Sequence, residues 1–140
     1  MAKIYLSLGS NIGDRNANLK EALSRLENEL GSPCKALSSM VETKSWGFEG
    51  ADFINCAACF ESDIAPEELL AVCKKIEREM GREEQLEFDS KGNRIYHDRI
   101  VDIDILLYGD EKINLPHLQI PHPQMRKRDF VMGPLMEIFD

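Results

Sequence analysis

Two aspartates separated by a single residue, Asp102 and Asp104, are the side chains of this sequence best placed to do chemistry. They interrupt an apolar run over residues 99–108 that predicts a strand, and side chains two residues apart on a strand point to the same face. Two carboxylates that face one space are typical of a Mg²⁺ site that also holds phosphate oxygens. The pair could equally lie on the solvated face of a half-exposed strand, and the sequence alone leaves both interpretations open. The opposite face is predicted to carry apolar side chains, which are Val101, Ile103, Ile105 and Leu107.

Arginines flank a long polar segment directly before this predicted strand. Arg82 follows Gly81, Arg99 stands three residues before Asp102, and residues 83–98 between them show no apolar periodicity. A guanidinium can bind phosphate oxygens through two parallel hydrogen bonds and offset developing charge, so the two arginines together favour phosphoryl chemistry. Each arginine taken alone is more typical of an ordinary surface position. Because long loops without structure are uncommon in compact domains unless they are functional, we expect residues 83–98 to be mobile and to close over bound phosphates.

The composition limits the classes of protein to be considered. The chain has 140 residues, with 17 Lys+Arg against 25 Asp+Glu and a formal net charge of −8. An acidic chain is poorly suited to sequence-independent binding of nucleic acid, which depends on lysine and arginine. No apolar run approaches the roughly 18 residues of a membrane helix, so we expect a cytoplasmic protein without nucleic-acid or membrane partners. The one clearly cationic stretch comprises His117, His122, Arg126, Lys127 and Arg128.

Four cysteines in a chain of this size do not make the dense framework of a small secreted protein. Cys56 and Cys59 have the spacing of a zinc-binding pair, but they fall in a run typical of a strand, where residues i and i+3 point to opposite faces. We therefore predict free thiols packed in the core.

The hydrophobic pattern predicts alternating strands and helices. Leucines at helical spacing indicate a helix that begins after Asp14, a suitable N-cap, and ends at Gly31. Pro66 suits the first turn of a second helix that ends at Gly81. Strands are predicted over residues 3–8, 34–42, 53–61 and 99–108, and residues 124–139 favour a helix. This β-α-β-β-α-β order predicts a single α+β domain over residues 1–140, ferredoxin-like, with helices packed on an antiparallel sheet and a short C-terminal extension.

Five short motifs, in order along nearly the whole chain, resemble the 6-hydroxymethyl-7,8-dihydropterin pyrophosphokinase family. They are Leu8-Gly9-Ser10-Asn11, Phe53-Ile54-Asn55, Gly81-Arg82, Arg99-x-x-Asp102-Ile103-Asp104-Ile105, and Pro121-His122 followed by Arg128 and Phe130. Each motif is weak alone, whereas five in this order are specific. The resemblance implies an enzyme of folate biosynthesis that transfers diphosphate from ATP to the hydroxymethyl group of the pterin and releases AMP.

The resemblance also implies residue roles. Asp102 and Asp104 would bind two Mg²⁺ ions that bridge the triphosphate of ATP, and Arg82 and Arg99 would be the catalytic arginines. The residues that would line the ATP site are Glu77, Ile105, His117, Gln119, His122 and Arg128. The residues that would bind the pterin are Thr43, Trp46, Phe53, Asn55 and Phe130, with the two phenylalanines stacked on its faces. The partners would be the two small-molecule substrates, and we expect a monomer.

The chain departs from the family pattern at a few positions. Residues 83–98 form a longer segment than usual, His97-Asp98 stand where a small residue and Pro are common, and Phe53 replaces a frequent Tyr. This longer segment lies directly before the aspartate pair, and the matching motifs do not define the path of its backbone.

Two other functions are compatible with parts of this pattern. A different metal-dependent enzyme, such as a nucleotidyltransferase or a phosphohydrolase, could use the aspartate pair but has no use for the predicted pterin residues. A ferredoxin-like regulatory module could bind a nucleotide without turnover, but this would leave the paired arginines unexplained. Phe53 and Phe130 taken alone are more typical of core packing.

Overall fold

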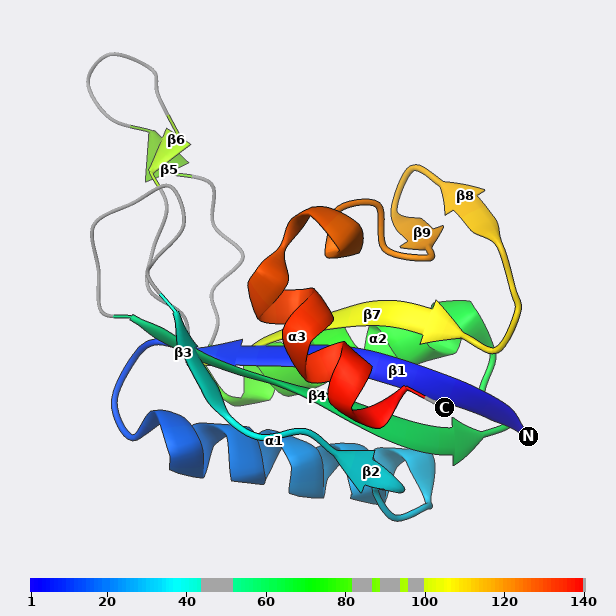
Figure 1. Cartoon of the computed structure of the whole chain (residues 1–140), viewed down its shortest axis with the longest axis horizontal. Coiled ribbons are helices and arrows are strands. Elements are labelled where there is room, and N and C mark those ends of the chain that lie inside the picture. The colour runs from blue at the N-terminus through cyan, green and yellow to red at the C-terminus, as the bar shows by residue number, and fades with distance from the viewer. Residues whose placement is uncertain (44–51, 82–86, 89–93, 96–99, 140) are drawn as a thin grey trace.

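The computed structural model describes residues 1–43, 52–81, 87–88, 94–95 and 100–139. Its centre is a five-stranded sheet in the order β2-β4-β1-β7, with β3 also paired to β4 (Figure 1). All pairings within this sheet are antiparallel. The strands of this sheet are β1 (Ala2–Ser10), β2 (Ala36–Leu37), β3 (Val41–Thr43), β4 (Phe53–Ser62) and β7 (Asp102–Tyr108). An α+β fold with an antiparallel sheet was predicted, and the structure has one.

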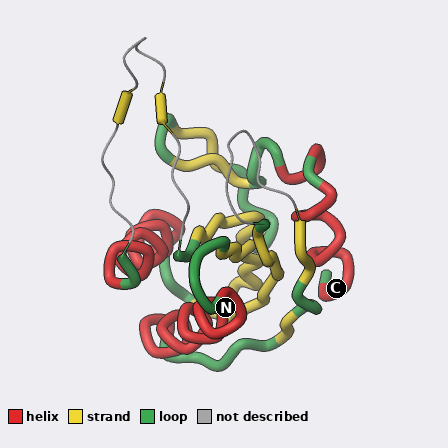
Figure 2. The backbone as a smooth tube through the Cα atoms, turned by 90° about the vertical axis from the view of Figure 1, so that its left-hand side faces the viewer, coloured by secondary structure: helices red, strands yellow, loops and turns green. Residues whose placement is uncertain are grey.

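Helices lie on both faces of the sheet. The helices α1 (Arg15–Leu30) and α2 (Pro66–Glu79) pack on one face, and α3 (Asp129–Ile138) packs on the other, as Figure 1 and Figure 2 show. The alternation in β1 produces this arrangement, because Ile4 and Leu6 are fully buried in the larger core under α1 and α2 while Tyr5 belongs to the smaller core under α3. Burying one such aliphatic side chain stabilises the fold by about 1.5–3 kcal/mol.

The ends of both predicted helices are confirmed. The Asp14 carboxylate accepts a hydrogen bond from the Ala17 amide at 3.1 Å and caps α1, and Gly31 ends α1 with a φ of 66°. Left-handed backbone of this kind favours glycine because it has no Cβ. Pro66 is the first residue of α2, and Gly81 follows its last turn with a φ of 103°.

The predicted strand over residues 34–42 is wrong as one continuous element. The structure has two short strands there, β2 and β3, with Ser38 between them. The Ser38 amide donates to the Ala57 carbonyl at 2.9 Å, but its hydroxyl oxygen accepts the Ala57 amide at 2.8 Å. A side-chain oxygen thus replaces the backbone carbonyl of a regular ladder, and the strand is interrupted at this point.

The predicted strand over residues 99–108 begins later, at Asp102, and its alternation is not regular. The register against β1 shifts between Tyr5 and Leu6, whose partners are Leu107 and Ile105. Leu106 is therefore an additional residue, and such a bulge moves the residues after it to the other face. Leu107 packs in the smaller core beside Tyr5, so its predicted place on the face of Ile103 and Ile105 is wrong.

Several short elements have no counterpart in the sequence prediction. The polar segment contains a two-stranded ladder, β5 (Glu87–Phe88) with β6 (Arg94–Ile95), and the proline-bearing stretch contains the hairpin β8 (Ile113–Leu115) with β9 (Leu118–Ile120). The helix-prone end divides into a 3₁₀ turn, η1 (Met125–Lys127), followed by α3. Strands of two or three residues are too short to show a period in the sequence.

The prediction of buried free thiols is confirmed for three of the four cysteines, and Cys34 is only partly buried. All four cysteines are free thiols, with Cys56 in the larger core and Cys59 in the smaller one. Burial raises the pKa of the Cys56 thiol to about 12, so it stays protonated at neutral pH. Within the part of the chain that the structure describes, no helix has both the length and the apolar character needed to span a membrane.

Candidate active site

Strand β7 presents its two aspartates on one face, as the sequence predicts. Asp102 is paired in register with Gly9 of β1 and Asp104 with Ser7, and both aspartates are half-buried. The residues between and beside them, Ile103 and Ile105, are buried in the core on the opposite face. The carboxylates therefore lie on the face that α3 partly covers, and the apolar side chains hold the strand from behind.

A buried carboxylate on α2 holds the outer edge of this strand. Glu77 is 2% exposed, and its Oε2 accepts a hydrogen bond from the Ile103 amide at 2.8 Å. Among the described residues β7 is the last strand of the sheet, so no described strand lies beside this amide on that side. Glu77 thus satisfies an edge amide at the residue that separates Asp102 from Asp104.

A cavity of about 490 Å³ opens at this edge of the sheet. Its walls come from α2, from β7, from the β8–β9 hairpin and from the segment that leads to α3. Both aspartates and all six residues expected at the ATP site line it. The lining residues include Leu70, Lys74, Glu77, Asp102, Asp104, Ile105, His117, Leu118, Gln119, His122, Gln124 and Arg128.

The segment before α3 contributes polar groups to this cavity. His122 is half-buried, and its Nδ1 accepts a hydrogen bond from the Gln124 amide at 3.2 Å. Burial, and then the positive charge of Arg128, lower the pKa of His122 below its usual value, while Asp102 acts in the opposite direction. His122 is therefore neutral at pH 7, with its proton on Nε2. The Arg128 guanidinium donates to the Gln124 side-chain oxygen.

The β8–β9 hairpin supplies two more of the expected residues. The His117 Nε2 lies 3.0 Å from the Glu67 Oε1 at the start of α2, and both side chains are largely exposed. Gln119 is exposed on β9, paired in register with Asn114 of β8. The contact with Glu67 ties the hairpin to the start of α2.

The expected pterin residues of β3 and β4 meet at one corner of the same sheet face. Thr43 and Phe53 are register partners, and the Asn55 Nδ2 donates to the Thr43 Oγ1 at 2.9 Å. Asn55 is 5% exposed and faces Gly9 of β1. A Cβ atom at Gly9 would lie only 2.7 Å from the Asn55 Oδ1, so the absence of a side chain at Gly9 lets Asn55 lie against β1.

The fourth described pterin residue, Phe130, is on α3. It is half-buried, packs against the smaller core that α3 covers, and has the Arg128 guanidinium carbon 5.7 Å from its ring centroid. Arg128, which lines the cavity, therefore contacts the first turn of α3 through the Phe130 ring. The stacking of a pterin between Phe53 and Phe130 stays a prediction. Trp46, Arg82, Arg99 and most of residues 83–98 lie outside the described residues.

The donor set at Asp102 and Asp104 fits magnesium better than zinc. Among the described residues no group of three or more His, Cys, Asp or Glu side chains is arranged to hold a metal ion. Structural zinc requires four protein ligands, whereas Mg²⁺ keeps several waters and takes one or two carboxylates together with substrate phosphates. Two adjacent carboxylates in a cavity of this size meet that second requirement.

Sequence reasoning missed several residues that line the cavity, among them Leu70, Lys74 and Gln124. The helical period could have identified two of them, because Leu70, Lys74 and Glu77 are spaced i, i+4 and i+7 and share one face of α2. Gln124 carries no such signal. Its place depends on the turn after His122, which only the folded backbone defines.

Comparison with known proteins gives a consistent result. A family model described as 7,8-dihydro-6-hydroxymethylpterin-pyrophosphokinase (HPPK) matches residues 5–140. A 2-amino-4-hydroxy-6-hydroxymethyldihydropteridine pyrophosphokinase from Porphyromonas gingivalis is 44% identical in sequence to this chain. The alignment covers 99% of this chain and 91% of that relative. A protein with the same name from Aquifex aeolicus is 42% identical, over 99% of this chain and 81% of the relative. Another from Bacillus subtilis is 38% identical, over 96% of this chain and 76% of the relative.

Proposed function

The chain belongs to the 7,8-dihydro-6-hydroxymethylpterin-pyrophosphokinase family and is an enzyme with pyrophosphokinase activity in folate biosynthesis. From this premise, we propose that it transfers the diphosphate of ATP to the hydroxymethyl oxygen of 6-hydroxymethyl-7,8-dihydropterin in a Mg²⁺-dependent reaction. The hydroxymethyl oxygen attacks the β-phosphorus, the bond between the α,β-bridging oxygen and the β-phosphorus breaks, and AMP leaves. The pterin hydroxyl loses its proton in the process.

One observation carries the proposal. A single cavity gathers both aspartates and all six residues expected to bind ATP, although they are spread over α2, β7, the β8–β9 hairpin and the segment before α3. Its volume of about 490 Å³ lies within the range of about 300–1,000 Å³ that is typical of small-molecule sites. A chance patch of polar residues would not collect the whole set in one concave space.

The cavity offers different surroundings to the two ends of ATP. Leu70, Ile105 and Leu118 supply apolar walls suited to the adenine ring. The Nε2–H of neutral His122 and the guanidinium of Arg128 supply donors for phosphate oxygens. These local donors matter because the chain as a whole carries a net charge of −8 and repels a polyanion at longer range.

Asp102 and Asp104 would hold the magnesium, and two ions are proposed. When bound, the metal neutralises charge on the polyphosphate and orients it. Glu77 supports the pair indirectly, because its bond to the Ile103 amide fixes the strand that carries both carboxylates. Arg82 and Arg99 are proposed to offset the charge that develops during transfer. Catalysis then consists mainly of positioning and charge stabilisation.

The sheet register brings the proposed pterin site next to the aspartate pair. Gly9 is the register partner of both Asn55 on β4 and Asp102 on β7, so Asn55 and Asp102 are two strand spacings apart, or about 10 Å. A pterin held by Asn55 and Thr43, between Phe53 and Phe130, would extend its hydroxymethyl group toward the phosphates. Trp46 is proposed to complete the recognition of its polar edge.

The finer description of the fold is also a proposal. The strand order β7-β1-β4-β2, with α1 after β1 and α2 after β4, supports a ferredoxin-like topology for the α+β fold. We likewise propose that residues 1–140 act as a single domain, that the enzyme works as a monomer and that it is cytoplasmic.

The proposal is tested by following the nucleotide product. The purified protein is incubated with ATP, Mg²⁺ and the hydroxymethyl pterin, and AMP and ADP are separated by chromatography. We expect AMP in proportion to pterin consumed, and no AMP when the pterin is omitted or the metal is removed by EDTA. Stoichiometric ADP would contradict the proposal, as would nucleotide binding without turnover, which would indicate a regulatory module.

A further inference from the structure

Arg15, the first residue of α1, makes an unusual pair of contacts. Its Nη1 donates to the Asp52 carbonyl oxygen at 2.6 Å and lies 3.3 Å from the Glu42 Oε1. The two acceptors are ten residues apart in the chain, one on β3 and the other directly before β4. The Arg15 side chain is 27% exposed, against 56% for Glu42, so the guanidinium is the less solvated partner.

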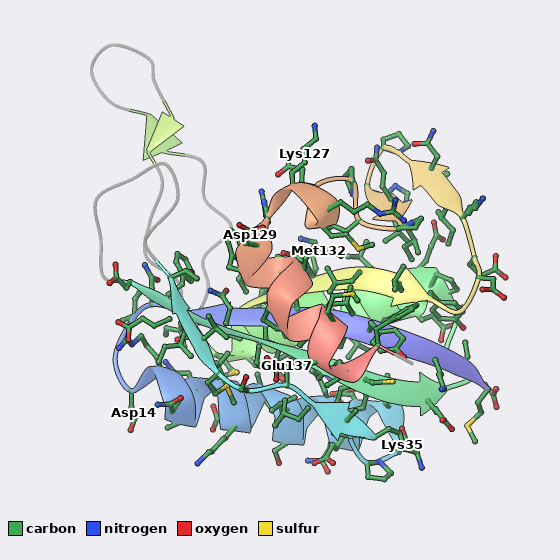
Figure 3. The ribbon with its side chains drawn as sticks, viewed as in Figure 1. Asp14, Lys35, Lys127, Asp129, Met132 and Glu137 are labelled. Carbon is green, nitrogen blue, oxygen red and sulfur yellow. The ribbon has the colours of Figure 1, made fainter. Side chains whose placement is uncertain are left out.

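These contacts fall at the corner where the proposed pterin residues meet. Glu42 directly precedes Thr43 on β3, Asp52 directly precedes Phe53 on β4, and Thr43 and Phe53 are register partners. One guanidinium therefore joins the two strand ends beside that pair. In Figure 3, Asp14 marks the end of α1 that lies on the same side of the molecule as these strand ends.

Arg15 stands in the first turn of α1, where a positive charge is electrostatically unfavourable. A cation in the first turn of a helix interacts unfavourably with the positive end of the helix dipole, by about 0.3–1 kcal/mol. The first turn of α1 holds no acidic side chain that would offset this. The Asp14 carboxylate at the N-cap offsets part of this cost. Further compensation comes from outside the helix, through the charge-assisted contacts of Arg15 with Glu42 and with the Asp52 carbonyl.

The strand that Arg15 secures has little support from pairing alone. β3 has three residues, and a strand of this length at the margin of a sheet is weakly held. Asn18, three residues further along α1, holds the end of β1, because its Nδ2 donates to the Ile12 carbonyl at 2.7 Å and to the Ser10 Oγ at 3.2 Å. The start of α1 thus fixes the ends of β1, β3 and β4 together.

We propose that Arg15 is a positioning residue for the pterin site, which holds Thr43 and Phe53 at the spacing the pterin requires without contacting either substrate. The proposal rests on the proposed function. Because the contacts of Arg15 do not involve the ATP cavity, its loss removes binding energy for the pterin and leaves ATP binding intact. Such a loss raises the KM for one substrate with little change in kcat.

The test compares Arg15→Ala with Arg15→Lys, Glu42→Gln and the control Lys20→Ala. The control removes a positive charge from an exposed position of the same helix. We expect Arg15→Ala to raise the KM for the pterin about tenfold, the scale of one lost charge-assisted hydrogen bond. Arg15→Lys keeps the charge but not the fork geometry, so about a threefold rise is expected. Glu42→Gln keeps the bond to Asp52 and should give a smaller rise than Arg15→Ala, and Lys20→Ala should give none.

The KM for ATP and the melting temperature are measured for every variant. Equal increases in KM for ATP and pterin, or an unchanged pterin KM in folded Arg15→Ala, would overturn the inference. If Arg15→Ala does not fold, Arg15→Lys and Glu42→Gln decide the question, and an unchanged pterin KM in both would equally overturn it. Failure of the wild-type protein to form a pterin diphosphate would instead refute the proposed function.

Discussion

Asp102 and Asp104 lie opposite Gly9 and Ser7 of β1, on the face of the sheet that lines the cavity. Their common face follows from strand alternation, and so does the burial of Val101, Ile103 and Ile105 behind them. The sequence could predict this much because both features depend only on local period. It could not predict the surroundings of the pair, since Glu77 and the cavity walls come from distant parts of the chain.

Replacing either aspartate tests the metal role at the residue scale. We expect Asp102→Asn and Asp104→Asn each to lower kcat by about 100-fold or more, because charge stabilisation at a reacting phosphate is lost. The melting temperature should stay the same or rise, since two neighbouring carboxylates repel one another. Asp110→Asn, an exposed aspartate in the turn after β7, is the matched control. Near-normal kcat in both site variants would contradict the metal role and would indicate that the two aspartates are ordinary solvated side chains of the strand.

Gly9 gives a second prediction at this scale. In Gly9→Ala the new Cβ would lie 2.7 Å from the Asn55 Oδ1 and 3.4 Å from the Phe53 ring, so Asn55 must shift. We expect a loss of stability of about 1–3 kcal/mol, typical of overpacking, together with a higher KM for the pterin.

The control for this variant is Gly133→Ala on α3, where no atom of the described residues lies within 4 Å of the new Cβ. Thermal melts and pterin kinetics should both be close to wild type for the control. Gly9→Ala with wild-type pterin kinetics would show that Asn55 does not bind the pterin.

At the scale of elements, α3 is joined to the opposite edge of the sheet by one carboxylate. Glu137, labelled in Figure 3, accepts hydrogen bonds from the Ser39 amide at 3.0 Å and from the Ser39 hydroxyl at 2.8 Å. These bonds lower the pKa of Glu137 below its usual value. They fix the C-terminal end of the helix whose first turn carries Phe130.

The shifted pKa of Glu137 predicts a pH-dependent contribution to stability. A lowered pKa means that the folded protein binds the proton more weakly than the unfolded chain, so the contribution is present near neutral pH and is lost as the pH falls below about 4. We expect Glu137→Gln to melt slightly below wild type at pH 7, and we expect this difference to be smaller near pH 3.5. The control is Glu111→Gln, at an exposed turn position. A difference in melting temperature that is the same at both pH values would contradict this role for the carboxylate.

The limits of sequence prediction are also clearest at the scale of elements. The caps at Asp14 and Gly31 were predictable because their chemistry is local. The break at Ser38 and the shifted face of Leu107 were not, because each depends on a neighbouring strand, β4 in one case and β1 in the other. The β8–β9 hairpin was missed for a different reason, since three-residue strands carry no period.

For the whole molecule, the site depends on how the antiparallel sheet arranges elements that are distant in sequence. The order β2-β4-β1-β7 places β1 between the proposed pterin strand and the aspartate strand, and Gly9 lies at the crossing point of the two registers. Family resemblance named the residues, but their gathering into one cavity is a property of the fold. Lys74 and Gln124 enter that cavity only through this arrangement.

The central claim is that the β-phosphorus of ATP is the atom attacked, and the position of a radiolabel tests it most directly. Parallel reactions with ATP labelled at the β- or the γ-phosphorus are run with Mg²⁺ and the hydroxymethyl pterin, and the pterin product is isolated. The account predicts that both labels pass into the pterin in equal amounts and that AMP is unlabelled. Transfer of the γ-label alone, with the β-label retained in ADP, would contradict it.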